Sequence, residues 1–240
     1  MKRSALAAVL VTLAAVSQGT AVIVAQYQFP NTASQALSAD ADASSSASAM
    51  TFSGNLTAQP PGFTGTYSSV QAGFSTAGNA FFRSSSLTTS ESGAVAGNDY
   101  FSFALTPTSG GLTFTSLTFD LGGNLAGSPA VAPFTSFAFV RTSLDGFASN
   151  VGSVESFDAT TAASAFANKT VNFSGALFQN VTQPVEFRVY IYSSIDGFNQ
   201  TANDSIVRLD NVELSAIPEP SAWILSLAGA VGLLGLRRRA

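Results

Sequence analysis

Alternation of apolar and polar residues with a period of two constrains the fold of this 240-residue chain more than any other feature. The clearest example is residues 185–192, where Val185, Phe187, Val189 and Ile191 alternate with Glu, Arg and Tyr. Successive side chains of a β-strand point to opposite faces, so the pattern predicts a strand with one buried face. Similar patterns predict further strands at 100–105, 112–121, 137–141, 170–173 and 206–214.

Turn residues separate these segments, and many short strands joined by polar turns predict an all-β fold, an antiparallel β-sandwich. Its expected topology is a jelly roll. Eight phenylalanines are expected to fill the core: Phe101, Phe103, Phe114, Phe119, Phe137, Phe139, Phe173 and Phe187.

Three local features qualify this pattern. The apolar phase of 112–121 switches between Phe114 and Leu117, which predicts a β-bulge near Thr115 or Ser116. Residues 159–167 are the one segment expected to form a short helix. Residues 33–48 are rich in Ala, Ser and Asp and are expected to form a loop.

The first 21 residues carry the charged, apolar and small-residue order of a signal peptide. Lys2 and Arg3 precede an apolar stretch at 5–16, and cleavage is expected after Ser17, Gly19 or Ala21. The domain at 22–216 would then begin with a strand that has Ile23, Ala25, Tyr27 and Phe29 on one face and Val22, Val24, Gln26 and Gln28 on the other.

The last 24 residues, 217–240, form a different kind of segment. Pro218, Glu219 and Pro220 enforce an extended entry, and residues 222–236 carry no charge. A helix of that length spans about 22 Å, less than the roughly 30 Å of a hydrocarbon core. Three arginines follow this stretch: Arg237, Arg238 and Arg239. Arginine side chains can snorkel to the interface and are retained on the cytoplasmic side, so we expect a short transmembrane helix with the domain outside.

The order of these elements in "IPEPSAWILSLAGAVGLLGLRRRA" resembles a PEP-CTERM sorting signal. The resemblance implies a Gram-negative bacterium that makes exopolysaccharide, and export of the protein through the inner membrane. It also implies an exosortase, a transpeptidase with a Cys nucleophile, that recognises Pro218, Glu219 and Pro220. Arg237–Arg239 would be the membrane stop. The protein would reach the cell surface or the extracellular matrix, and the alternative is an uncleaved membrane anchor.

Composition excludes several classes of function. The chain contains no Cys and no His, which excludes disulfides, Ser-His-Asp catalysis and ordinary zinc sites. Between positions 20 and 217 it has five basic and thirteen acidic residues, a net charge of −8 that disfavours nucleic acid as a partner.

We expect a non-catalytic protein. A glycoside hydrolase or lyase is the less favoured alternative, because a hydrolase needs two carboxylates flanking one bond. The sequence offers only unremarkable candidate pairs, namely Glu155 with Asp158 and Glu186 with Glu213. A further alternative is an adhesin or self-assembling subunit that pairs through a sheet edge.

The segments "FVRTSLDGF" at 139–147 and "YIYSSIDGF" at 190–198 echo each other. Asp-Gly is a strong turn pair, so they can simply be two similar strand ends. The functional interpretation places both loops at one edge of the domain. Phe147 and Phe198 would then stack on a polysaccharide, while Asp145 and Asp196 would bind hydroxyls or a cation.

The closing segment, "VRLDNVELS" at 207–215, resembles the last strand of jelly-roll carbohydrate-binding modules. The resemblance implies a structural Ca²⁺ held by Asp210, together with Asp40 or Asp42. Ca²⁺ needs six to eight oxygen ligands, and the sequence does not show the complete set.

Overall fold

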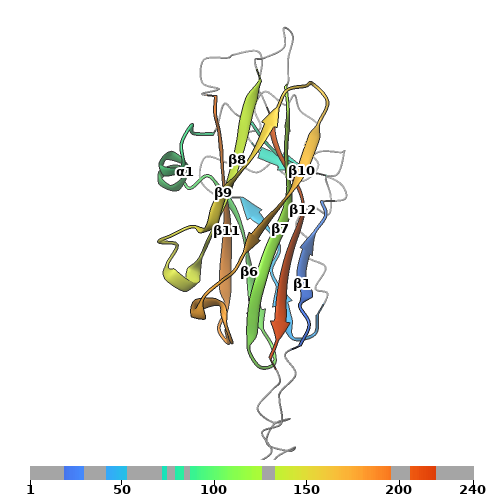
Figure 1. The fold of residues 1–240 in the computed structure, drawn as a ribbon, viewed down its shortest axis with the longest axis vertical. Helices are drawn as coiled ribbons and strands as arrows, with labels where there is room; N and C mark the ends of the chain where they lie inside the picture. The colour runs from blue at the N-terminus through green and yellow to red at the C-terminus, as the bar shows by residue number, and fades with distance from the viewer. Residues whose placement is uncertain are drawn as a thin grey trace, which may run out of the picture.

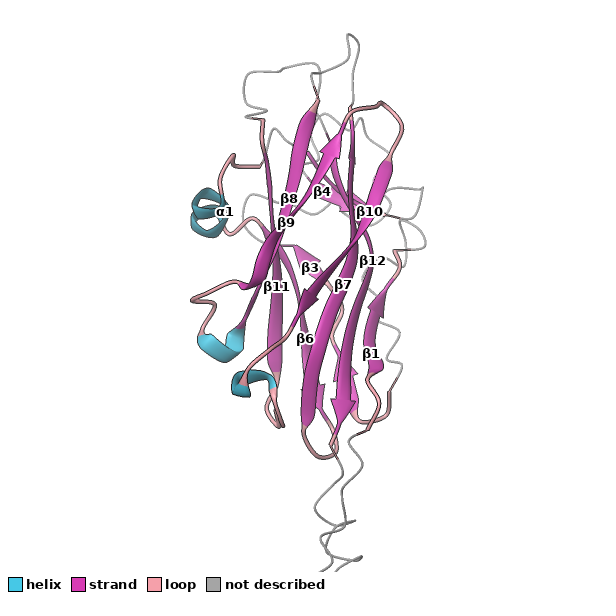
Figure 2. Ribbon diagram, in the orientation of Figure 1, coloured by secondary structure: helices cyan, strands magenta, loops and turns pink. Residues whose placement is uncertain are grey.

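The computed structural model describes residues 19–29, 42–52, 72–74, 79–83, 87–125, 133–195 and 206–219. These residues form two six-stranded sheets that pack face to face, as Figures 1 and 2 show. The expected all-β sandwich is therefore confirmed. Every strand pair within the sheets is antiparallel.

The first sheet has the strand order β10 (Ala165–Asn172), β7 (Leu112–Asn124), β12 (Ile206–Pro218), β5 (Ala80–Arg83) and β4 (Ala72–Phe74), with β1 (Val22–Tyr27) also paired with β12. The second has the order β2 (Ser45–Ala47), β6 (Tyr100–Pro107), β11 (Val185–Ser193), β8 (Phe134–Thr142) and β9 (Val151–Ala159), with β3 (Thr51–Phe52) beside β6. From β9 to β12, each strand crosses to the other sheet.

The core lies between the sheets and is rich in phenylalanine. Phe187 of β11 is fully buried and contacts the rings of Phe103 and Phe114. Six of the eight phenylalanines expected in the core belong to this cluster: Phe101, Phe103, Phe114, Phe119, Phe173 and Phe187. Burial of large apolar rings is the main stabilising contribution available to a chain without disulfides.

The other two phenylalanines correct the expected phase of β8. Ala138 and Val140 face the core, so the alternating Phe137 and Phe139 point to the outer side of the second sheet. Phe139 is buried there in a second cluster, and Phe137 is half-buried. Both faces of β8 carry apolar residues, so alternation alone could not decide which face is inside.

The bulge expected in the 112–121 segment is confirmed. Ser215 pairs with Ser116 and Ala216 pairs with Phe114, which leaves Thr115 of β7 as the extra residue. A similar irregularity interrupts the regular alternation expected for β1. The register with β12 shifts around Val24, so Val24 and Ala25 are both fully buried, whereas Ile23 is 37% exposed.

The helix expected at 159–167 is wrong, because β9 ends at Ala159 and β10 begins at Ala165. Pairing with β8 and β7 overrides the helix propensity of this Ala-rich stretch. The α-helix within the described residues is instead α1 (Glu91–Gly97). The Ser90 side chain accepts a hydrogen bond from the Gly93 N–H at its N-terminus, and Asn98 ends it in a left-handed conformation. Similarly, β2 lies within a stretch expected to be a loop.

Candidate functional site: an aromatic face and the end of the last strand

The last strand leads directly into the segment that is predicted from the sequence to be a sorting motif. Pro218 pairs with Leu112 as the final residue of β12. The Glu219 N–H donates to the Gly111 carbonyl over 2.8 Å, and the Thr113 hydroxyl donates to Glu219 Oε1, also over 2.8 Å. Pro220 and the Arg237–Arg239 cluster lie outside the described residues.

The first strand begins where the last strand ends. β1 runs antiparallel to β12, with Val22 opposite Ala216, and Gly19 lies next to Ile217 and Pro218. In Figure 1, the start of β1 and the end of β12 lie at the same end of the elongated sandwich. Among the described residues, none forms a helix long and apolar enough to span a membrane.

The two echoing loops do not share one edge. β8 and β11 are antiparallel neighbours, with Thr142 opposite Phe187 and Ser136 opposite Ser193. Their carboxyl ends therefore leave the sheet at opposite ends, about 20 Å apart at roughly 3.4 Å per residue. The expectation of one shared edge is wrong; Asp196 and Phe198 themselves lie outside the described residues.

Asp145 is the last residue of the short 3-10 helix η3 (Ser143–Asp145) and stabilises the turn that follows it. Its carboxylate accepts hydrogen bonds from the N–H groups of Ala148 and Ser149, and from the Ser149 hydroxyl. Burial acts to raise the pKa of Asp145, but the hydrogen bonds outweigh it and hold that pKa below its ordinary value. The carboxylate therefore serves as an internal cap of the loop.

Phe147 also has a structural role, because its ring contacts Arg188. Its backbone has a φ of 63°, in the left-handed region, and its ring lies 3.5 Å from the Arg188 guanidinium carbon. The same guanidinium lies 4.5 Å from the centre of the Tyr100 ring and donates to Glu186. In this cation–π arrangement, the Arg188 guanidinium contacts the Phe147 ring, which was expected to stack on a sugar.

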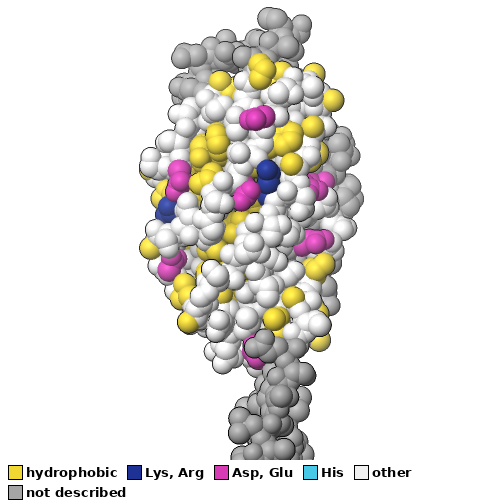
Figure 3. All heavy atoms as spheres, viewed as in Figure 1, with side chains coloured by type: hydrophobic (Ala, Val, Ile, Leu, Met, Phe, Trp, Pro, Cys, Tyr) yellow, Lys and Arg dark blue, Asp and Glu magenta, His cyan; other side chains and the backbone are white. Residues whose placement is uncertain are grey.

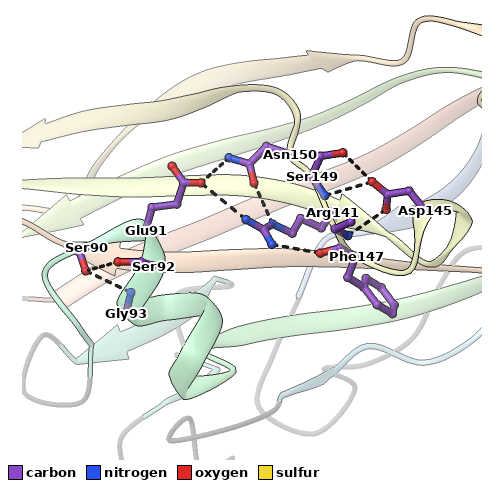
Figure 4. A network of polar contacts seen from close by, with 10 residues as sticks. Ser90, Glu91, Ser92, Gly93, Arg141, Asp145, Phe147, Ser149 and Asn150 are labelled. Atoms are coloured by element: carbon purple, nitrogen blue, oxygen red, sulfur yellow. Dashed lines mark hydrogen bonds and ion pairs between the residues drawn. The ribbon is translucent and has the colours of Figure 1, made fainter.

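Arg141 of β8 links the loop to α1, as Figure 4 shows. Its guanidinium donates to the Asn150 side chain over 2.8 Å and to the Phe147 carbonyl over 3.0 Å. Glu91 of α1 lies 3.7 Å from the same guanidinium and accepts from Asn150. With its side chain only 14% exposed, Arg141 acts as a structural tie.

Around these arginines, the outer side of the second sheet carries a set of contacting rings that we call the aromatic face: Tyr100, Phe137, Phe139, Tyr190 and Tyr192. Phe139 and Tyr190 stack at 5.0 Å with an interplanar angle of 6°. Phe137 and Tyr192 stack at 4.5 Å with an angle of 10°. Such contacts add about 0.5–1.5 kcal/mol per pair beyond burial.

Helix α1 packs on the middle of the aromatic face. Ala94 packs with Tyr100, Phe139 and Tyr190, which are all buried. Figure 2 shows α1 on this outer side of the sheet. Phe137 and Tyr192 are half-buried, and β9 places the small, exposed Ser156 directly opposite Phe137.

The next row of the sheet is polar. Thr135 of β8 faces Asp158 of β9, and the Thr135 hydroxyl donates to the Asp158 carboxylate over 2.7 Å. On the other side, the Thr135 N–H donates to the Ser194 hydroxyl. In the space-filling view of Figure 3, hydrophobic side chains gather over the half of the molecule where β8, β9 and β10 lie, and charged groups are few.

Asp210 lies on the outer side of the other sheet, opposite Asp120. Burial raises the pKa of Asp210, and the nearby Asp120 carboxylate adds to this rise, which the Asn211 N–H partly offsets. Asp120 itself accepts from Asn168 and Asn211. Asp42 binds the Ser44 N–H before β2, whereas Asp40 is not described. Among the described residues, no three His, Cys, Asp or Glu side chains form a metal-binding group.

The candidate catalytic pairs are not brought together. Glu186 points outward from the second sheet and Glu213 outward from the first, so the thickness of the sandwich separates them. On β9, Asp158 shares its face with Thr135, whereas Glu155 is opposite the inward-facing Ala138.

Sequence reasoning missed Phe137 and Tyr192 as surface residues. A signal was present, because Tyr190 and Tyr192 occupy the outward phase of β11 that Glu186 and Arg188 define. Two aromatic residues in the polar phase of an alternating strand indicate a second apolar surface.

No family model and no curated protein matches the sequence. Among solved structures, the K1 cleaved adhesin domain of Lys-gingipain from Porphyromonas gingivalis W83 is 18% identical and has a TM-score of 0.34, with 82% of this chain and 98% of that chain covered. The K3 cleaved adhesin domain of the same protein is 19% identical and has a TM-score of 0.33, with 72% and 91% covered. Both TM-scores are too low to support a functional assignment.

Proposed function

We propose that this protein is exported, processed by an exosortase and displayed at the bacterial surface or in the extracellular matrix. There its β-sandwich binds polysaccharide and does not catalyse a reaction. The observation that carries the proposal is the direct continuation of β12 into Pro218 and Glu219, beside the start of β1. A domain held at that one end leaves its outer sheet surfaces free to bind.

The strand order supports a binding scaffold. The strands of the two sheets interleave along the chain as in a jelly roll, an eight-stranded double sheet found in lectin domains. The matching strand orders are β1-β12-β7-β10 in the first sheet and β6-β11-β8-β9 in the second. Fold does not determine function, so the proposal depends on the tail and on the surface of the domain. The two carboxylates of each candidate pair lie on different faces, and this arrangement supports a non-catalytic role.

The localisation is tested in producing cells by fractionation and intact mass spectrometry. We expect protein outside the cytoplasm that lacks about the first 21 residues and part of the 217–240 segment. Alanine at Pro218, Glu219 and Pro220 should leave the tail attached and the protein in the membrane. Alanine at Pro60 and Pro61 is the control and should not change processing. Full-length wild-type protein in the cytoplasm would refute the proposal.

A self-assembling subunit is the second candidate. Within the described residues, β10 pairs only with β7, and Phe166 of this edge strand is 36% exposed. Lys169 in the middle of β10 works against edge-to-edge pairing, so binding is the better supported role. Light scattering separates the two, because self-assembly requires particle mass to rise with protein concentration.

A further inference from the structure

The half-buried end of the aromatic face combines a ring platform with hydrogen-bonding groups. Tyr192, Phe137 and Ser156 form one cross-strand row, and Ser194, Thr135 and Asp158 form the neighbouring row. Rows on one face of a sheet are two residues apart, about 7 Å. The two rows therefore present apolar rings and polar oxygens within one small area.

The platform is rigid. β8 pairs with β11 on one side and with β9 on the other, so both edges of its backbone are used. Phe137 and Tyr192 stack nearly parallel at 4.5 Å, and Tyr192 also meets the edge of Phe139 at 6.2 Å. Ser156 is the neighbour of Phe137 on the β9 side, and among the described strands no large side chain fills that row. An extended peptide could not add beside β8 as a strand, because its backbone groups are already paired on both sides.

The polar row provides the complementary chemistry. The Asp158 carboxylate accepts one hydrogen bond from Thr135 and has further lone pairs for hydroxyl groups. Burial, followed by the charge of Glu91, raises the pKa of Tyr192, so its phenol stays a neutral donor near pH 7.

Charge further restricts the ligand. Asp158 is the one charged side chain among the six residues of the two rows. The nearby cations are engaged elsewhere, since Arg141 binds Asn150 and the Phe147 carbonyl, and Arg188 lies against two rings. A polyanion would meet a carboxylate with no available guanidinium, whereas an uncharged sugar would not.

We propose that Phe137, Tyr192 and Ser156, with Thr135 and Asp158, form a subsite for an uncharged polysaccharide. A pyranose ring would place its apolar C–H face on the ring platform and its hydroxyls toward Asp158 and Thr135. This inference rests on the proposed function and names the ligand class and the surface.

Affinity electrophoresis of the full chain in detergent tests the subsite. The gels contain hydroxyethylcellulose, dextran or mannan as neutral probes and alginate as the anionic probe. We expect at least one neutral probe to retard the protein. Phe137→Ala should weaken that retardation about tenfold, equivalent to about 1.4 kcal/mol. The matched control is Phe166→Ala, which removes an exposed ring from the other sheet and should leave binding unchanged.

A second variant guards against an unfolded Phe137→Ala protein. Ser156→Glu leaves the ring stack intact but places a longer, charged side chain beside it, and it should also abolish retardation. Absence of retardation by every neutral probe, preference for alginate, or equal losses in Phe137→Ala and Phe166→Ala would overturn the proposal. Binding by a protein that proves cytoplasmic would refute the proposed location alone. A surface protein that binds alginate but no neutral probe would refute the subsite alone.

Discussion

Replacing Phe187 by alanine is the sharpest test of which sheet faces form the core. Phe187 is fully buried and contacts three rings, those of Phe103 at 5.3 Å, Phe114 at 5.2 Å and Phe173 at 5.7 Å. Loss of such a side chain costs about 3–5 kcal/mol in free energy of unfolding, because the cavity does not fully collapse. For a domain of this size, each kcal/mol lowers Tm by roughly 2–4 °C, so we expect a decrease of about 6–20 °C.

The matched control is Phe137→Ala on the outer side of the second sheet. Phe137 is half-buried and, among the described residues, stacks on Tyr192 alone, so we expect a loss of about 1–2 kcal/mol. Urea unfolding followed by circular dichroism gives both free energies and shows from the m-value whether unfolding remains two-state. Equal losses in the two variants, or a larger loss for Phe137→Ala, would refute the assignment of inner and outer faces.

Three further predictions concern the first sheet. Gly122→Ala should destabilise the domain by about 1–3 kcal/mol in urea unfolding, because a Cβ there would collide with the Ala165 carbonyl of β10; unchanged stability would contradict this. Asp210→Asn should raise Tm near pH 7, because burial raises the folded-state pKa of Asp210 and the ionised carboxylate therefore destabilises the fold. The gain in Tm should disappear below the unfolded-state pKa of about 3.9, and a gain that persists there would contradict the prediction. Thr113→Val should speed amide exchange at Glu219 by removing the hydrogen bond to its carboxylate, and equal exchange rates in both proteins would show that this bond does not hold the strand end.

Much of the sheet structure was predictable because its signal is local. Strands in which only one face carries aliphatic residues, such as β11, revealed both their position and their buried side. The bulge at Thr115 was predictable as well, since a single extra residue shifts the apolar phase visibly. In each case the pattern of neighbouring residues contains the whole answer.

The inner face of β8 was not predictable by the same reasoning. Phe137 and Phe139 compete with Ala138 and Val140 for the core, and the larger rings favoured the wrong choice. The second cluster under α1 decides the matter, because the helix provides another apolar surface for Phe139 and Tyr190. That helix has only seven residues and depends on its caps and on packing, so its sequence signal is weak.

The candidate site shows why a repeated motif is a poor guide to a shared surface. The two Asp-Gly-Phe segments have the same turn chemistry, yet each follows one of two antiparallel neighbouring strands. In such a pair, identical strand ends must lie at opposite ends of the sheet. Residues from different segments instead meet where strands are in register, as Tyr192, Phe137 and Ser156 do across three strands. A search for binding residues in this fold should therefore follow cross-strand rows, which only the strand order reveals.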